Sequence, residues 1–159
     1  MLMTIAAIGR LKDGPERNLC ERYLGRATTA GRSLGFTFAS REFPESRAGT
    51  AALRKEQEAS TLLGVATAGA ATIALDEAGK SIDSQTFAAR LARWRDDGTP
   101  GIAFCLGGPD GHGQLLLQSA ALRLAFGAMT WPHQLARVML AEQLYRAVTI
   151  LSGHPYHRE

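Results

Sequence analysis

Apolar and polar residues follow two alternating periods along this chain, and each change of period marks an expected boundary between strand and helix. Short apolar or alternating runs predict strands, whereas longer runs with apolar residues three or four positions apart predict helices. The expected strands are residues 4–8, 34–40, 71–75, 101–106 and 122–126. The expected helices are residues 15–30, 48–63, 84–95, 114–121 and 132–151. This alternation predicts an α/β fold, with a mostly parallel sheet and helices on both of its faces.

Neither a low-complexity linker nor an internal repeat interrupts the chain, so we expect one domain over residues 1–159. The N-terminal run 1–9 is apolar, but it has no basic segment before it and meets Arg10 directly. It therefore predicts a first strand and not a signal peptide, and we expect no membrane segment. The two cysteines, Cys20 and Cys105, do not suggest a disulfide framework, which favours a reducing, cytoplasmic location.

The net charge of the chain is +3 at pH 7, and the excess of cations lies wholly in residues 1–75. A basic half of a protein suits a polyanionic partner such as RNA. A solvated surface would produce the same excess. The charge by itself therefore leaves both interpretations open.

The expected helix at 132–151 is apolar on more than one side, which exceeds the single stripe that covers one core. Its apolar positions are Leu135, Val138, Met139, Leu140, Leu144, Val148 and Leu151. We therefore expect part of this helix to be buried in the symmetric interface of a homodimer.

Two glycine-containing segments follow expected strands, and both would open at the same edge of the sheet. One is Gly-Gly-Pro-Asp-Gly at 107–111, and the other is Leu-Asp-Glu-Ala-Gly-Lys at 75–80. Ligands of open α/β sheets bind beyond the carboxyl ends of the strands, and glycine lets the backbone approach a ligand closely. Segment 107–111 is neither a Walker loop nor a GxGxxG turn. Either segment alone is equally a tight structural turn, but two at one edge favour a ligand pocket.

Residues 126–131, Phe-Gly-Ala-Met-Thr-Trp, combine a strand end, a glycine and bulky apolar groups. Such a segment can line an apolar slot for a flat ring, with backbone groups at the edge of the ring. Plain core packing is the alternative. Pro132 suits the start of a helix, which places His133 near the positive end, where an imidazolium is disfavoured. His133 is then either a substrate contact or an exposed residue of the first turn.

The C-terminal segment carries a second group of polar and aromatic residues. Glu142 and Arg146 are four positions apart, in the order that favours an ion pair on a helix. Tyr156 and His157 can stack on a base, and Arg158 can bind a phosphate. We therefore predict that Arg146, Tyr156, His157 and Arg158 bind the substrate. A disordered terminus is the alternative.

A zinc site formed by His133, His154 and His157 is the metal site that the histidines would allow, but their spacing fits no strong metal motif. We therefore expect no metal. A GxSxG hydrolase signature is also lacking.

Taken together, these segments resemble the RlmH (YbeA) family of SPOUT RNA methyltransferases. The matching motifs are Leu-Asp/Glu-x-x-Gly-Lys at 75–80, Gly-Gly-x-x-Gly at 107–111, Met-Thr-aromatic-Pro-His at 129–133, Glu-x-x-Tyr-Arg-Ala at 142–147 and Tyr-His-Arg at 156–158. Residues 5–12, Ile-Ala-Ala-Ile-Gly-Arg-Leu-Lys, also resemble the first strand and turn of the family. The resemblance covers essentially the whole chain and is strongest from residue 71 onward.

The resemblance implies a cytoplasmic homodimer that uses S-adenosyl-L-methionine to methylate N3 of a pseudouridine in large-subunit (23S) ribosomal RNA, on the assembled ribosome. It also implies a C-terminal trefoil knot, which general topology rules would disfavour. The cofactor contacts that it implies are Leu75, Gly107, Phe126, Gly127, Ala128, Met129, Thr130 and Trp131. Residues 124–128 lack the serines that are frequent there in the family. A hydroxyl contact would be lost, and we expect backbone contacts to maintain binding.

The sequence does not identify the group that takes the N3 proton, and the candidates are His133, Arg146 and His157. Two other functions remain open. One is a SPOUT methyltransferase that acts on another RNA, such as tRNA, and the other is a non-catalytic module that binds RNA or the ribosome.

Overall fold

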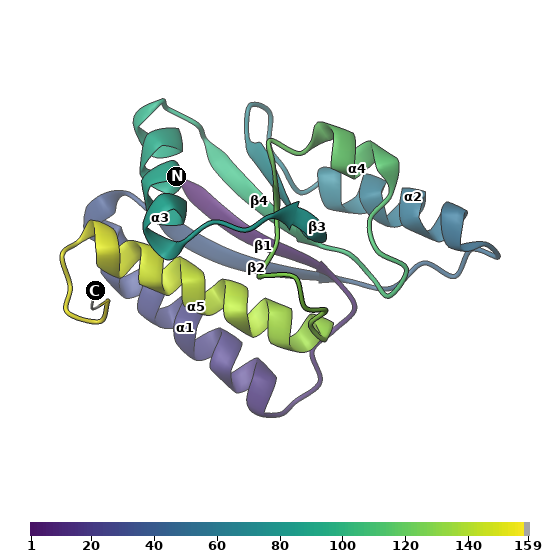
Figure 1. Ribbon diagram of the computed structural model, residues 1–159, viewed down its shortest axis with the longest axis horizontal. Coiled ribbons are helices and arrows are strands. Elements are labelled where there is room, and N and C mark those ends of the chain that lie inside the picture. The colour runs from purple at the N-terminus through teal and green to yellow at the C-terminus, as the bar shows by residue number, and fades with distance from the viewer. Residues whose placement is uncertain (158–159) are drawn as a thin grey trace.

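Five parallel strands form one sheet in the computed structural model, which describes residues 1–157 of the chain (Figure 1). They are β1 (Leu2–Ile8), β2 (Thr37–Phe43), β3 (Ala71–Lys80), β4 (Gly101–Leu106) and β5 (Leu122–Leu124). Their order across the sheet is β2-β1-β4-β3-β5, and each neighbouring pair is parallel. Because all five strands run the same way, their carboxyl ends lie at one edge of the sheet.

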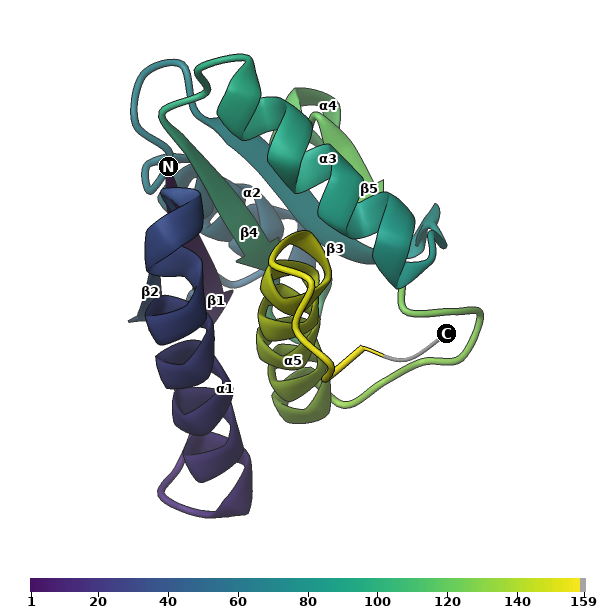
Figure 2. The ribbon, with the colours of Figure 1, turned by 90° about the vertical axis from the view of Figure 1, so that its left-hand side faces the viewer.

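Helices cover both faces of the sheet. On one face lie α1 (Pro15–Gly31), α3 (Ser84–Asp96) and α5 (His133–Leu151), and on the other lie α2 (Ala51–Leu63) and α4 (Gln114–Ser119). Helix α5 lies between α1 and α3 and contributes Leu140 and Leu144 to the larger core (Figure 2). Leu62 of α2 and Leu116 of α4 belong to the smaller core. The predicted fold class is therefore confirmed, while the knot stays a prediction from the resemblance.

Side chains cap the starts of two helices, α2, whose start was predicted too early, and α3, whose start was predicted correctly. The hydroxyl of Thr50 accepts a hydrogen bond from the amide three residues later at 3.2 Å, so α2 begins directly after Thr50 and not at residue 48. Asp83 caps α3 in the same way, at 2.6 Å. Helix α5 begins at His133 with Pro132 as its cap, one residue later than predicted. Helix α4 ends at Ser119, two residues earlier than predicted.

The predicted strand at 34–40 starts three residues too early. Residues Arg32–Leu34 form a 3-10 turn, which ends at Gly35 with a φ of 74°. This left-handed conformation favours glycine. Strand β2 then begins at Thr37, opposite Leu2 of β1. The pattern was misleading because Phe36 is already buried in the core before the strand begins.

Strand β3 continues to Lys80, although the sequence predicted a strand that ends at residue 75 and a loop after it. The pairing with β5 jumps from Leu75 to Lys80, and both lie opposite Leu124. The residues between them form a bulge, which lets a polar segment follow the strand direction. Asp76 in this bulge pairs with Arg123 of β5 at 2.6 Å. Strand β5 itself ends at Leu124, two residues before the predicted end.

Within the described residues, the helices are too short or too polar for any of them to traverse a lipid bilayer.

Candidate active site

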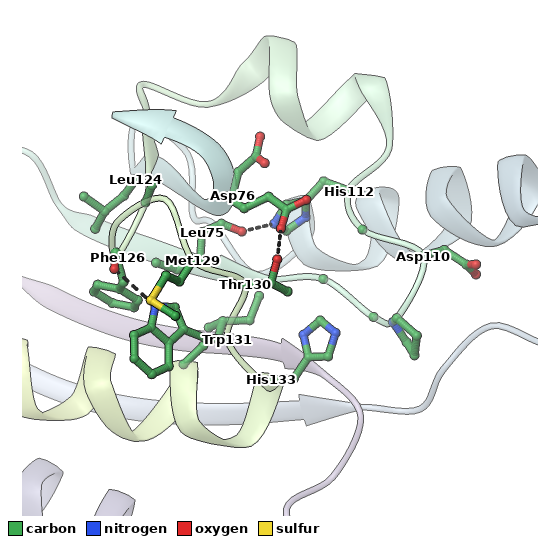
Figure 3. A pocket seen from close by; sticks show the side chains of 18 of the residues that line it. Leu75, Asp76, Asp110, His112, Leu124, Phe126, Met129, Thr130, Trp131 and His133 are labelled. Carbon is green, nitrogen blue, oxygen red and sulfur yellow. Dashed lines mark hydrogen bonds between the residues drawn. The ribbon is translucent and has the colours of Figure 1, made fainter. Parts of the chain in front are cut away.

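A cavity of about 330 Å³ opens at the carboxyl ends of β3, β4 and β5 (Figure 3). Its walls come from residues 75–77 at the β3 bulge, residues 106–112 after β4, and residues 124–131 after β5. His133 and Ala136 at the start of α5 complete the lining. The segments that the sequence placed at one edge of the sheet therefore do meet around one pocket, where ligands of α/β sheets bind.

Most of the predicted cofactor contacts lie in this wall. They are Leu75, Gly107, Phe126, Gly127, Met129, Thr130 and Trp131. Ala128 is also described, but it does not line the cavity. The geometry therefore brings together seven of the eight positions, and their binding of a cofactor stays a prediction.

The glycine turn after β4 has little space for a side chain at Gly107 or Gly108. A Cβ added to Gly108 would lie 2.8 Å from Oε2 of Glu58, and one added to Gly107 would lie 3.1 Å from Nδ1 of His112. Both glycines are buried. The turn therefore presents its backbone to the cavity, as the sequence predicted for a close approach to a ligand.

Helix α2 supports the turn from outside the pocket. Arg54 donates to both carboxylate oxygens of Asp110, at 2.6 and 3.2 Å. This hydrogen-bonded pair lowers the pKa of the Asp110 carboxyl. Glu56, half a turn later, accepts a hydrogen bond from the amide of Gln114 at 2.8 Å. Two side chains of one helix thus fix both ends of the segment that follows β4.

The segment after β5 is fixed by two hydrogen bonds. The hydroxyl of Thr130 donates to Glu77 at 3.0 Å, and the indole Nε1 of Trp131 donates to the backbone oxygen of Phe126 at 3.2 Å (Figure 3). Gly127 has a φ of 102°, which a residue with a side chain would rarely adopt. Met129 remains 72% exposed at the rim. The segment therefore forms an apolar wall with an open edge.

A second group of residues, the C-terminal cluster, lies at the other end of α5. It comprises Glu142, Arg146, Tyr156 and His157. Arg146 donates to Glu142 at 2.6 and 3.0 Å, and the hydroxyl of Tyr156 donates to the same carboxylate at 3.1 Å. The guanidinium of Arg146 lies 5.0 Å from the centre of the Tyr156 ring and 3.4 Å from Nδ1 of His157. Burial is the main cause that raises the pKa of Tyr156 to about 12, so its hydroxyl stays protonated.

The C-terminal cluster and the pocket are separated along α5. Arg146 lies ten positions after Ala136 of the pocket wall, a rise of about 15 Å in an α-helix. The predicted substrate residues Arg146, Tyr156 and His157 therefore cluster with one another and not with the predicted cofactor residues of the same chain. Arg158, also predicted to bind substrate, lies outside the described residues.

A groove of about 690 Å³ lies between these two regions, lined by residues of α1, α3, α5 and the segment after β5. Tyr23, Phe87 and Val138 line it, and Glu142 stands at one side. Phe126 lines both the groove and the pocket. The groove thus connects the pocket wall with the C-terminal cluster.

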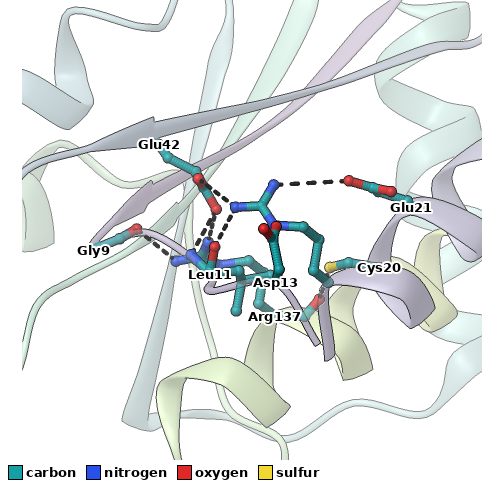
Figure 4. A network of polar contacts seen from close by, with 8 residues as sticks. Gly9, Leu11, Asp13, Cys20, Glu21, Glu42 and Arg137 are labelled. Atoms are coloured by element: carbon teal, nitrogen blue, oxygen red, sulfur yellow. Dashed lines mark hydrogen bonds and ion pairs between the residues drawn. The ribbon is translucent and has the colours of Figure 1, made fainter. Parts of the chain in front are cut away.

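Helix α5 is anchored near the pocket by a buried cation (Figure 4). Arg137 is only 3% exposed, and it donates to Glu42 of β2 at 2.5 Å and to the backbone oxygen of Gly9 at 3.0 Å. Arg17 of α1 reaches the other oxygen of Glu42 at 3.4 Å. Cys20 donates to the backbone oxygen of Arg137, and burial raises the pKa of its thiol to about 11. The network joins the start of α5 to β1, β2 and α1.

Comparison with known proteins assigns the family. A family model described as "Predicted SPOUT methyltransferase" matches residues 1–157. The chain belongs to this family. The resemblance identified from the motifs is therefore confirmed, and the protein is an enzyme of the methyltransferase class.

Curated SPOUT relatives match over almost the full length. A protein of Nitrobacter hamburgensis is 55% identical over 159 residues, and proteins of Rhodopseudomonas palustris (strain BisB5) and Brucella anthropi are each 54% identical over 159 residues. In each case 99% of both chains is covered, and each relative is named "Ribosomal RNA large subunit methyltransferase H". The solved structure of the SpoU methyltransferase AviRb from Streptomyces viridochromogenes, in complex with AdoMet, aligns with a TM-score of 0.42 at 12% identity, covering 96% of this chain and 61% of that one.

The sequence did not indicate the roles of two residues, His112 in the pocket wall and Arg137 at the anchor of α5. His112 lies in the pocket wall, but its position after a glycine turn resembles that of any exposed loop residue. Arg137 lies five positions before Glu142 on the same helix, but its partner is Glu42, which is distant in sequence. No sequence pattern pairs those two residues. In residues 1–157, histidines, cysteines and carboxylates do not gather in groups of three or more that could hold a metal ion.

Proposed function

We propose that this SPOUT methyltransferase uses S-adenosyl-L-methionine to methylate N3 of a pseudouridine in large-subunit (23S) ribosomal RNA, acting as a cytoplasmic homodimer on the assembled ribosome. The observation that carries the proposal is the meeting of three family motifs around one pocket at the carboxyl edge of the sheet. The names of the full-length relatives support ribosomal RNA as the substrate.

The pocket suits a cofactor with a flat ring and a polar chain. Its volume lies within the range of small-molecule sites. Phe126 and Trp131 offer apolar faces, and Gly107 and Gly108 of the turn line the pocket with backbone that carries no side chain. Segment 124–128 is not serine-rich, so backbone groups would hold the cofactor there. When bound, S-adenosyl-L-methionine supplies an already activated methyl group.

The protein residues then have two tasks. They must orient the target base so that N3 faces the methyl group, which is a matter of position more than of covalent chemistry. They must also assist the loss of the N3 proton, because N3 exchanges a hydrogen for the methyl. His133 at the pocket, and Arg146 and His157 in the C-terminal cluster, are the candidates for this assistance.

A homodimer would unite the two halves of the site. An antiparallel packing of two α5 helices about a two-fold axis brings the end of one helix beside the start of the other. The C-terminal cluster of one chain would then approach the pocket of its partner, although it is distant from its own. Apolar side chains near the start of α5 favour such a contact: Trp131 is 40% exposed and Leu135 is 42% exposed.

Exposed cations at the same edge of the sheet as the pocket support an RNA substrate. Arg10 and Lys12 follow β1, and Arg47 follows β2. The two loops are linked by the Gly9 amide, which donates to the backbone oxygen of Phe43 at 2.8 Å. Within residues 1–157, all three cations are exposed and lack a carboxylate partner. They can therefore bind phosphate groups that flank the target base.

Methyl transfer to different RNAs tests the proposal. The protein and labelled S-adenosyl-L-methionine are incubated with assembled ribosomes, with free large-subunit RNA and with tRNA. Incorporation mainly into ribosomes is expected. Incorporation mainly into tRNA would instead identify the protein as a SPOUT methyltransferase that acts on tRNA. Cofactor binding measured by calorimetry separates both enzymes from a non-catalytic module, which would bind ribosomes but no cofactor.

A further inference from the structure

His112 lies in the pocket wall but belongs to none of the motifs and has no part in the proposed reaction. Its ring is placed between the glycine turn and Leu75, which directly precedes the β3 bulge (Figure 3). Nε2 lies 2.8 Å from the backbone oxygen of Leu75. Because a carbonyl oxygen can only accept, Nε2 carries the proton and donates it.

The Leu75 carbonyl lies where the regular sheet pairing stops. The ladder of β3 with β4 ends at Leu75, opposite Leu106. The ladder with β5 is interrupted at the same residue by the bulge. A backbone carbonyl at such a point needs another donor. His112 provides it from the glycine turn, so one side chain connects two of the three segments around the pocket.

The other ring nitrogen touches the turn itself. Nδ1 is buried, and among the described residues it has no hydrogen-bond partner. It lies close enough to Gly107 that an added Cβ would come within 3.1 Å. The ring thus donates a hydrogen bond to Leu75 on one side and lies against Gly107 on the other. It sets the spacing between two of the predicted cofactor contacts.

We propose that His112 is a positioning residue for the cofactor: its Nε2–H tether holds the Leu75 carbonyl and the Gly107 turn at the spacing that cofactor binding requires. This inference rests on the proposed function, because S-adenosyl-L-methionine is the ligand expected in this pocket. His112 acts through Leu75 and Gly107 and takes no part in methyl transfer.

The surroundings of His112 favour its neutral form. Burial is the main cause that lowers its pKa, and the nearby His133 acts in the same direction. The Leu75 carbonyl, Asp76 of β3 and Glu58 of α2 act in the opposite direction, and the net effect remains a lowered pKa. An imidazolium would also add an Nδ1–H that has no acceptor. Cofactor affinity should therefore be constant above about pH 6.5, the ordinary pKa of histidine. It should fall as the pH decreases through the lowered pKa.

Three substitutions separate the tether from simple packing. In His112→Gln, the amide nitrogen is as many bonds from the backbone as Nε2, so the donor remains but cannot titrate. In His112→Asn, the amide reaches only as far as Nδ1. His112→Leu fills the space without a donor. Calorimetric titration with S-adenosyl-L-methionine should show affinity near that of the unaltered chain for Gln. For Asn and Leu it should show a loss of about tenfold, or about 1.4 kcal/mol.

The pH profile and the tautomer provide independent readouts. As the pH decreases below about 6.5, the cofactor affinity of the unaltered chain should fall, and the affinity of the Gln variant should not show this decrease. Asp76, Glu58 and His133 are present in both proteins, so a difference between their pH profiles would be caused by His112. Imidazole nitrogen shifts in NMR should show a neutral ring protonated at Nε2. Thermal unfolding of each variant verifies that it is folded.

A folded His112→Leu protein with unchanged affinity would overturn the inference and leave the proposed function intact. The same holds if folded Gln and Leu variants lose affinity equally, or if Nδ1 carries the proton. Failure of the unaltered chain to bind S-adenosyl-L-methionine would overturn the proposed function, and this inference with it.

Discussion

Gly107 forms part of the pocket wall because its backbone takes a place that no side chain can share. Its φ is not in the left-handed region, so the backbone itself would accept another residue. The constraint is space: an added Cβ meets the His112 ring and the Gly111 backbone at 3.1–3.2 Å. Crowding at this position should therefore act on the pocket and not on the whole fold.

Substitution of Gly107 by valine should abolish measurable binding of S-adenosyl-L-methionine, because the larger side chain displaces the glycine turn. Calorimetry measures the binding, and circular dichroism verifies the fold. Gly25→Ala is the matched control, since a Cβ at Gly25 meets nothing within 4 Å. Normal cofactor binding by a folded Gly107→Val protein would show that the pocket is misplaced.

Tyr156 combines a ring that packs on Tyr145, with centroids 4.7 Å apart, and a hydroxyl that binds Glu142. Base stacking is worth roughly 1–3 kcal/mol, so Tyr156→Ala should lower methyl transfer by about ten- to a hundredfold. Tyr156→Phe keeps the ring and should lose less. Cofactor affinity should be unchanged in both. Equal activity of the Ala variant and the unaltered chain would contradict a role in substrate binding.

The sequence predicted residues of the site when their signal was local. Turn glycines, the apolar segment 126–131 and the Glu142–Arg146 spacing can each be recognised within a few positions, and the structure places each where the pattern suggested. His112 and Arg137 were not recognised, because their roles depend on Leu75 and Glu42, which are brought to them only by the fold. The pairing of polar residues that are far apart in the sequence leaves no local pattern in it.

At the scale of elements, α5 is the helix that connects the pocket with the C-terminal cluster. Its start is fixed by the buried pair of Arg137 and Glu42, whose side chains are 4% and 21% exposed. A buried charge that loses its partner is costly, whereas loss of an exposed pair costs little. The pair therefore holds the first turns of α5 at a fixed position relative to the sheet edge.

Arg137→Met should destabilise the fold by about 3–5 kcal/mol, because it removes the more buried of the two cations that pair with Glu42, the other being Arg17. The double variant Arg137→Met/Glu42→Met should recover part of this loss, since no unpaired buried charge remains. Arg93→Met is the control, because Arg93 and Asp97 form an exposed pair on α3 and should contribute less than about 1 kcal/mol. Urea unfolding at one fixed protein concentration measures all three. Equal losses for the Arg137 and Arg93 variants would contradict the buried-anchor interpretation.

The sequence predicted every strand and every α-helix but neither all of their ends nor the 3-10 turn at Arg32–Leu34. Apolar periodicity is a strong signal, so all five strands and five α-helices were expected in the right order. The bounds of β2 and β3 were wrong because a buried Phe36 precedes one strand and a polar bulge extends the other. In both cases tertiary contacts override the local pattern.

At the scale of the whole molecule, the proposed site requires two chains. The pocket and the C-terminal cluster lie about 15 Å apart along α5, and the antiparallel partner proposed above would bring them together. The knot implied by the family resemblance is likewise a property of the whole chain path, which local patterns do not specify.

Mixing two inactive proteins tests whether each site is formed by the pocket of one chain and the C-terminal cluster of its partner. Gly107→Val impairs the pocket, and deletion of residues 154–159 removes the tail. Each protein alone should be inactive, whereas a mixture refolded together should recover about a quarter of normal activity, because half of the dimers are mixed and each of these has one intact site. Size measurement by light scattering should show dimers throughout. A strictly monomeric mass, or no recovery in proven mixed dimers, would contradict the arrangement.

The most direct test of the proposed activity is mass mapping of the modified nucleotide. Ribosomes that lack the modification are incubated with the protein and S-adenosyl-L-methionine, and the large-subunit RNA is then digested and its nucleosides are analysed. The account predicts one new methyl group, on N3 of a pseudouridine, that does not form with Gly107→Val. A methyl group on a different base, on ribose or on tRNA would contradict the account.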